Sequence, residues 1–388
     1  MNQESILITT LPQEIIINIL SRLPIRTVVA CKLVCKPWLE LLETREFTTS
    51  HLSKSVPGLA VFHYLDLFRI FEFNDEPGFE HHRLHYDLVT EFQRTSFVNP
   101  SHCSIWIQGS TNGLLFLREI DTQPHIHYIC NPITREYIEL PSPDELVHFY
   151  PTVKTYGFGT SKITRENKVV RVLHECTFYT DTLTLLDIPK SECHVYTLGT
   201  GTWRKIGHGL KMEYNCRSVG AFLNGNLHWL VEDMKGLFQI SCFNLEIELF
   251  TTFSPPSAIS GKRRILGGLF VLGDCLCLSD NTSEDEIVIW LMKEYGNEKS
   301  WSKEYVINKH PDFGGECYEV VRPLKAFKNG DILMSWEDFF MFYYSNETKM
   351  ISKIDMSELH NKWGVDSMLH TSSFVSLKDL DRENVRTF

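Results

Sequence analysis

The sequence lacks the features of membrane, secreted and disulfide-rich proteins. No apolar run of about 18 or more residues, the length that spans a bilayer, occurs in the 388 residues. The first ten residues have neither the basic start nor the cleavage site of a secretory signal. The eleven cysteines are scattered, and no Cys-x-x-Cys pair occurs among them. We therefore expect reduced, mostly buried thiols, a cytoplasmic or nuclear location and no membrane association.

Positive charge is also scarce. The chain has 38 Lys and Arg against 49 Asp and Glu, which gives a formal net charge of -11. A chain of this charge repels phosphate backbones, so nucleic acid is not an expected partner. Charged residues make up 22% of the chain and hydrophobic residues 43%, which is ample for a large folded core.

Sequence motifs of common cofactor-binding and nucleophile sites are absent as well. Neither a Gly-x-x-x-x-Gly-Lys-Ser/Thr loop nor a Gly-x-Ser-x-Gly elbow occurs. His81, His82 and His85 lie close together, but no cysteine or clustered carboxylate completes four ligands at an established zinc spacing. A solvated loop is favoured there, and we expect no cofactor, no metal and no catalytic residue.

The N-terminal segment shows helical periodicity. Four apolar residues recur at i, i+3, i+4 and i+7, and so share one helical face: Ile16, Ile19, Leu20 and Leu23. Thr10 is a plausible N-cap, and Pro24 ends this helix. The periodicity resumes after a second plausible cap, Thr27, and Pro37 interrupts it. The pattern therefore predicts two short helices, the second beginning near Pro37.

The same segment resembles an F-box. Two Leu-Pro steps, a Val-Cys-Lys-x-Trp element and a trailing phenylalanine stand at the family's spacing: Leu11-Pro12, Leu23-Pro24, Val34 to Trp38, and Phe47. The resemblance implies a three-helix module, over residues 8–52, that binds a Skp-type adaptor and through it a cullin-RING ligase. The adaptor-facing residues that it implies are Leu11, Pro12, Leu23, Pro24, Val34, Lys36 and Trp38. The alternative is that such residues only hold the helices together, and Trp38 suits both roles.

A different pattern follows His51. Short alternating apolar runs are bounded by Gly, Asn, Asp and Pro, as is typical of strands and turns. A turn followed by an apolar strand begins near residues 112, 224, 273 and 329, and two further units fit between and before them. A repeat of roughly 50 residues is the size of a four-stranded kelch-like blade. The sequence predicts an all-β propeller over residues 55–388, with six blades favoured and five or seven left open.

These repeats resemble the plant F-box-associated domain. The matching stretches include Asn112 to Leu115, Asn131 to Tyr137, Gly157 to Gly159, Val195 to Arg204, Leu223 to Trp229 and Ile289 to Gly296. The fold class is thus an α+β multidomain chain, an F-box followed by a propeller. The resemblance implies a non-catalytic substrate receptor of a Skp-cullin-F-box ubiquitin ligase, which recruits a protein target for ubiquitination and proteasomal degradation.

Three segments depart from the repeats and are candidate target-binding loops: 175–189, 254–264 and 310–319. The alternative is that they are ordinary solvated connections. The alternative function is a standalone carbohydrate-binding or glycoside-hydrolysing propeller. It would use Trp203 or Trp229 for stacking on sugars, and loop carboxylates such as Asp144, Glu145 or Asp233 for hydrolysis. We favour a place in the core of the blades for both tryptophans, and the carboxylates are not part of a recognisable catalytic motif.

Overall fold

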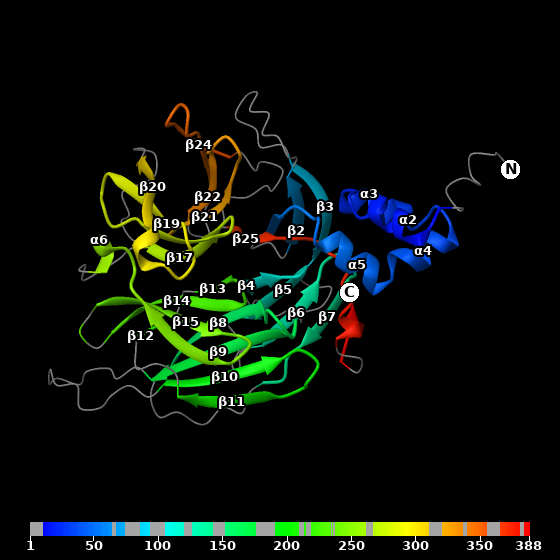
Figure 1. Cartoon of the computed structure of the whole chain (residues 1–388), viewed down its shortest axis with the longest axis horizontal. Coiled ribbons are helices and arrows are strands. Elements are labelled where there is room, and N and C mark those ends of the chain that lie inside the picture. Colours follow the sequence, from blue (N-terminus) through cyan, green and yellow to red (C-terminus); the bar gives the residue numbers. More distant parts are fainter. Residues whose placement is uncertain are drawn as a thin grey trace.

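Helices occupy the first part of the chain and strands the rest. The computed structural model describes residues 11–63, 67–73, 86–93, 105–119, 126–142, 152–175, 191–208, 213–214, 219–233, 235, 237–260, 267–309, 320–336, 340–354, 365–380 and 384–388. The helices form a separate module that lies beside one end of the β region, next to the C-terminus (Figure 1). The structure confirms the prediction of short N-terminal helices followed by an all-β propeller-like region.

Within residues 11–52, the part of the helical module that the structure describes, there are four helices: α2 (Gln13–Leu20), α3 (Ile25–Cys31), α4 (Lys36–Leu42) and α5 (Arg45–Leu52). The prediction of two helices from periodicity, and of three from the resemblance, was wrong in number. Pro12 and Pro24 stand directly before α2 and α3, where a residue without an N–H is readily accommodated. Thr27 lies inside α3 and is not its cap, and Thr10 lies outside the described residues.

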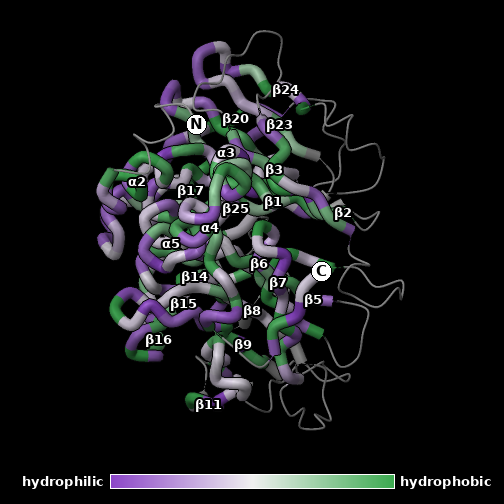
Figure 2. The backbone as a smooth tube through the Cα atoms, turned by 90° about the vertical axis from the view of Figure 1, so that its right-hand side faces the viewer, coloured by the Kyte–Doolittle hydropathy of each residue, from purple (hydrophilic) through white to green (hydrophobic). Residues whose placement is uncertain are grey.

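The buried face of α2 is only partly the one that periodicity predicts: Ile16, Leu20 and Leu23 belong to the core or pack against it, but Ile19 does not. Ile17 and Leu20 are buried, whereas Ile19 is exposed. The core of the module consists of Ile17, Leu20, Ile25, Val28, Leu41, Leu42 and Phe47, joined by Phe374 from the far end of the chain. α2 contacts α5, and buried residues of both helices belong to the same core. The helices lie together beside the strands of the β region (Figure 2).

The strands form five hydrogen-bonded sheets. The first contains β25 (Val365–His370), β1 (Gly58–His63), β2 (Leu67–Phe73) and β3 (Tyr86–Gln93). The second contains β4 (Ile105–Thr111), β5 (Leu114–Glu119), β6 (His127–Asn131) and β7 (Glu136–Glu139), with β26 (Arg386–Thr387) at its edge. The fourth contains β17 (Gly267–Leu272), β18 (Cys275–Asp280), β19 (Glu286–Met292) and β20 (Trp301–Asn308). The fifth contains β21 (Val321–Ala326), β22 (Ile332–Trp336), β23 (Phe340–Tyr344) and β24 (Ile351–Lys353).

The third sheet has nine strands and consists of two antiparallel units. One unit is β8 (Thr152–Thr160), β9 (Asn167–Glu175), β10 (Ser191–Thr197) and β11 (Trp203–His208). The other is β13 (Val219–Leu223), β14 (Asn226–Glu232), β15 (Phe238–Asn244) and β16 (Leu249–Phe253), with β12 (Glu213–Tyr214) paired to β14. Among the described strands, the two units are hydrogen-bonded as one sheet through the short parallel pairing of β8 with β13.

Two glycines explain that pairing. Gly157 of β8 lies opposite Gly220 of β13, and the indole of Trp229 covers both. A Cβ at Gly157 would lie 2.9 Å from the Trp229 ring, and one at Gly220 would lie 2.7 Å from it. Glycine therefore permits the close approach of the two strands beneath the ring.

The first strand of the β region pairs with a late strand within the first sheet. β25 pairs antiparallel with β1, so that Leu59 lies opposite Leu369. Neighbouring units touch through one strand each, in the order β4, β8, β13, β17, β21, β25 and back to β4. Pairing an early strand with a late one is how a ring of sheets avoids open edges.

Most thiols of the described segments are in the interior, in agreement with the sequence. The described cysteines are all free, and Cys130, Cys193, Cys242 and Cys277 are buried. Burial raises the pKa of each of these thiols. In the part of the chain that the structure describes, no helix is long and apolar enough to cross a membrane.

Candidate functional site

The helical module exposes an unusual number of large apolar side chains. They form what we call the outer apolar surface: Leu11, Ile15, Ile19, Val29, Leu33, Val34 and Leu39. Leu33 and Val34, between α3 and α4, are 88% and 63% exposed. Surfaces of this kind, on a module with a small core of its own, mark contacts with another protein.

The residues that sequence predicts to face an adaptor occupy two environments. Leu11, Pro12, Pro24, Val34 and Lys36 are exposed. Lys36 forms an exposed ion pair with Glu40 on the next turn of α4, at 3.7 Å. Such an exposed pair contributes little to stability, so Lys36 remains able to contact a partner.

Leu23 and Trp38 are placed differently. Both are half-buried and pack against the core of the helical module. A substitution of either one will therefore disturb the module as well as any surface that it helps to form.

Sequence reasoning missed part of the outer apolar surface. Ile15 and Ile19 are exposed and lie one turn apart on one side of α2, and the exposed Leu11 precedes this helix. Their spacing was available in the sequence as a second apolar series, offset from the one that we assigned. Leu33 carried no such signal, because it lies in the turn after α3.

The inner side of the module is fixed to the β region. Val89 of β3, Ile133 of the turn between β6 and β7, and Phe374 pack against its core. The Ile25 N–H donates a hydrogen bond of 3.3 Å to Oε1 of Glu72 at the end of β2. Arg26 pairs with Asp87 of β3 at 3.6 Å. These contacts come from early and late parts of the β region and fix the helical module against it.

A buried histidine supports this joint. Nε2 of His51 lies 3.1 Å from the Leu23 carbonyl oxygen, and Nδ1 lies 3.0 Å from the Ser55 hydroxyl. The carbonyl can only accept, so Nε2 carries the hydrogen of a neutral ring. Burial lowers the pKa of His51, and the charge of Lys54 acts in the same direction.

The candidate target-binding segments are only partly described. Residues 310–319 lie outside the described residues, and of 175–189 only Glu175, the last residue of β9, lies within them. The first half of 254–264 is held in place by burial and hydrogen bonds. α6 (Ser257–Ser260) buries Ile259. The Ser254 N–H donates to Glu298 at 2.7 Å, and the Trp301 indole donates to the Ser254 carbonyl at 3.2 Å.

The residues weighed for sugar chemistry have structural roles where they are described. Trp229 is fully buried, and the Trp203 indole donates a 2.8 Å hydrogen bond to the Pro141 carbonyl. Oδ1 of Asp233 accepts from the N–H groups of Lys235 and Leu237, at 2.8 and 2.9 Å, and so stabilises its own turn. Asp144 and Glu145 lie outside the described residues.

No metal site was found in the described part of the chain. No group of three or more His, Cys, Asp or Glu side chains there is arranged to hold an ion. His81, His82 and His85, the histidines considered above, lie outside the described residues.

Comparison with known families agrees with both halves of this architecture. Residues 69–379 match the F-box associated beta propeller domain, and residues 8–48 match an F-box-like domain. The chain belongs to the F-box proteins with an F-box-associated propeller domain. The resemblance seen in the sequence is thereby confirmed.

Relatives of this F-box protein occur in Arabidopsis thaliana. F-box protein At3g07870 is 27% identical over 370 residues, which cover 86% of this chain and 85% of that one. F-box protein CPR1 is 24% identical over 396 residues, covering 97% and 91% of the two chains. F-box protein At5g49610 is 29% identical over 301 residues, covering 75% and 77%. The similarity to these F-box proteins therefore spans both the helical module and the β region.

Proposed function

We propose that this F-box protein is a substrate-recognition subunit of a Skp-cullin-F-box ubiquitin ligase. The observation that carries the proposal is the outer apolar surface of the F-box, above all the exposed side chains of Leu33 and Val34. Leaving this much apolar area in water is unfavourable, and a Skp-type adaptor would cover it. Pro12, Pro24 and Lys36 lie on the same module with exposed side chains and are candidate contacts at its edges.

The β region would hold the target. We propose that its four-stranded units are six blades of kelch-like size: β1–β3 with β25, β4–β7, β8–β11, β13–β16, β17–β20 and β21–β24. Cyclic contact between their first strands supports this count, because a closed ring returns to its starting blade.

The three candidate target-binding segments would share one face of this ring. In a four-stranded antiparallel unit, the turns after the first and third strands lie at one end of the strands. The turn after the second strand and the segment that follows the fourth strand lie at the opposite end. Segment 175–189 follows a second strand, β9, whereas 254–264 and 310–319 follow the fourth strands β16 and β20. The turn with Ile133, which contacts the F-box, is a third turn. Target and F-box would therefore occupy opposite faces.

The chain would act by tethering and would make no bond itself. Holding a target near the conjugating enzyme raises their effective concentration, which is sufficient for transfer by the rest of the ligase. The standalone sugar-binding function is disfavoured, because Trp229 is buried and Asp233 stabilises its own turn.

Co-purification tests the proposal directly. The full chain and a chain lacking residues 1–50 would be expressed with a Skp-type adaptor, and the complexes would be separated by size. We expect an equimolar complex with the full chain only. Equal adaptor binding by the truncated chain would show that the F-box is not the docking module.

A further inference from the structure

A second group of exposed apolar residues lies far from the F-box along the chain. Ile163, Ile247 and Leu249 are 78%, 64% and 59% exposed. Ile163 is in the turn between β8 and β9, and the other two are in and after the turn between β15 and β16. We call these three residues the turn patch. Single exposed apolar residues are ordinary on a surface, but here two turns from neighbouring units bring three of them to one place.

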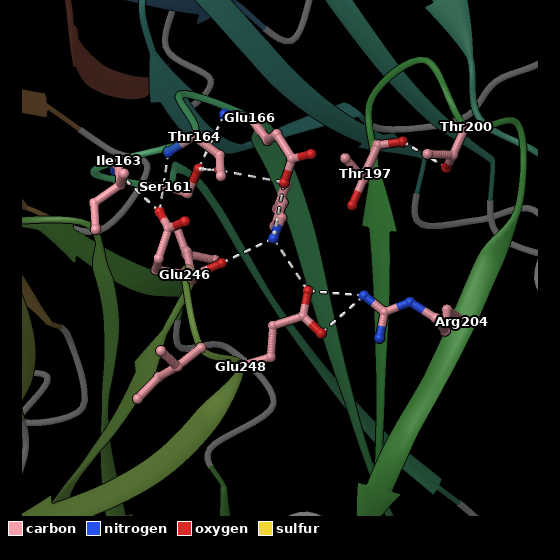
Figure 3. Close-up of polar contacts among 12 residues, drawn as sticks. Ser161, Ile163, Thr164, Glu166, Thr197, Thr200, Arg204, Glu246 and Glu248 are labelled. Carbon is pink, nitrogen blue, oxygen red and sulfur yellow. Dashed lines mark hydrogen bonds and ion pairs between the residues drawn. The ribbon is translucent and has the colours of Figure 1, made fainter.

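The two turns are bonded to each other. Oε2 of Glu246 accepts from the N–H groups of Ile163 and Thr164, at 2.9 and 3.2 Å, as the close-up shows (Figure 3). These bonds also lower the pKa of the Glu246 carboxyl, so it is ionised at neutral pH. Within the first turn, the Glu166 N–H donates to the Ser161 hydroxyl at 2.9 Å. The backbone that presents Ile163 is therefore held in one conformation.

A network of charged residues supports the second turn. Both carboxylate oxygens of Glu248 accept from the Arg204 guanidinium at 2.8 Å (Figure 3). The nearly buried Lys168 lies 3.1 Å from Glu248 and donates to the Leu245 carbonyl at 2.9 Å. Burial opposes ionisation of Glu248, but hydrogen bonds from Arg204 and Lys168 outweigh it and lower the pKa. Fixed turns lose little conformational freedom on binding, which favours their use as a docking surface.

The charge that remains free at this place is positive. Glu246 is engaged by two N–H groups, Glu248 by Arg204 and Lys168, and Glu166 by Lys168 at 3.1 Å. Lys162 and Arg165, on either side of Ile163 in its turn, are exposed and form no ion pair with any described residue. The turn patch therefore combines apolar side chains with two cations that form no ion pair with any described residue, on a chain whose net charge is -11.

We propose that the turn patch is a second protein-docking site, which takes a partner segment presenting a large apolar side chain beside Asp or Glu. The apolar side chain would cover Ile163 and Ile247, and the carboxylates would pair with Lys162 and Arg165. The turn patch is made by a first and a third turn, so it lies at the end of the strands opposite to the three proposed target-binding segments. It is also separate from the outer apolar surface. It does not depend on adaptor binding.

Peptide binding to the full chain tests this inference. The probes are fluorescein-labelled peptides with one Leu or Phe flanked by two Asp or Glu on each side, and matched peptides with Lys at the flanking positions. We expect saturable anisotropy changes with the acidic peptides and none with the Lys peptides. Ile163→Ser, Ile247→Ser and Arg165→Glu should each weaken binding at least tenfold.

Matched substitutions elsewhere serve as controls. Met350→Ser changes an exposed apolar residue in the turn between β23 and β24, and Lys299→Glu changes an exposed lysine before β20. Both should bind the acidic peptides as the unaltered chain does, and thermal unfolding should show that every variant is folded. The proposal is overturned if no acidic peptide binds, if Lys peptides bind equally, or if the turn-patch variants bind as the controls do.

Discussion

The ring of Phe374 meets the imidazole of His51 edge-on, with their centroids 5.4 Å apart. Phe374 follows β25, the strand that closes the β region onto β1. The centroids of the Phe374 and Phe47 rings are 6.3 Å apart. The Lys32 ammonium nitrogen lies over the Phe374 ring, 5.2 Å from its centroid. The last part of the chain thus completes both the ring of strands and the core of the F-box. Phe374 is thus one of several residues that couple the two domains, together with Val89 and Ile133.

Loss of that side chain should loosen the joint. Phe374→Ala is expected to cost about 3–5 kcal/mol of unfolding free energy, the usual range for removing a buried phenylalanine. Urea denaturation gives this value, and limited proteolysis between residues 53 and 57 shows whether the F-box detaches. Phe374→Leu, which keeps most of the apolar volume, should cost clearly less. Unchanged protease resistance in Phe374→Ala would mean that Val89 and Ile133 suffice to hold the module.

Two classes of F-box substitution should behave differently. Val34→Ser and Leu33→Ser change exposed side chains, so each should weaken adaptor binding by about 2 kcal/mol, as loss of an interface anchor does, without altering stability. Pro24→Ala should weaken binding similarly. Trp38→Ala should reduce both binding and stability, because Trp38 also packs on the core of the module. Calorimetric titration with the adaptor and thermal unfolding separate the two effects.

The candidate target-binding segments can be replaced one at a time. Short Gly/Ser linkers in place of 175–189 or 310–319 should leave adaptor binding intact, because that surface lies in the F-box. We expect at least one replacement among the three segments to abolish capture of a target. In 254–264 only residues 261–264 should be exchanged, since Ile259 is part of the core. If an identified target is captured and degraded with all three segments replaced, recognition lies elsewhere on the ring.

Stability should fall in mild acid because of buried histidines. Burial lowers the pKa of His51, of His228 to about 4 and of His370 to about 3. Unfolded histidines bind protons near pH 6.5, whereas these folded sites do not. Their stabilisation is therefore complete above about pH 6.5 and is lost as the pH falls toward the folded pKa values, by up to about 1.4 kcal/mol per pH unit for each group.

Urea denaturation at pH 7.5, 6.5 and 5.5 measures this dependence. His228→Gln removes one titrating group, so the slope of unfolding free energy against pH should be shallower, whatever its effect at pH 7.5. A slope that is unchanged in His228→Gln would contradict the assignment. Nδ1 of His228 lies 3.0 Å from the Ala221 carbonyl and Nε2 lies 2.8 Å from the Tyr295 hydroxyl. Glutamine can replace part of this bonding.

Local sequence determined the kinds of element. The prolines at 12 and 24 set the starts of α2 and α3, because proline is tolerated at a helix start and not within it. Turns such as Asn112-Gly113 and Asn224-Gly225 have positive φ at both residues, a conformation that Asn and Gly adopt most readily, and so they marked hairpins. The two-part architecture and the repeat followed from these signals, and the buried Trp229 was predicted as core.

Tertiary contacts decided the rest. The apolar pattern of α2 does not decide between Ile17 and Ile19 as core residues, because five of its eight residues are apolar; packing within the module decides it. The pairing of β1 with β25 and the insertion of Phe374 into the F-box join residues about 300 positions apart, for which local sequence carries no signal. The turn patch likewise exists only because Glu246 of one unit binds the Ile163 turn of another. Sequence fixes which elements form, but only packing between distant elements determines which side chains remain exposed.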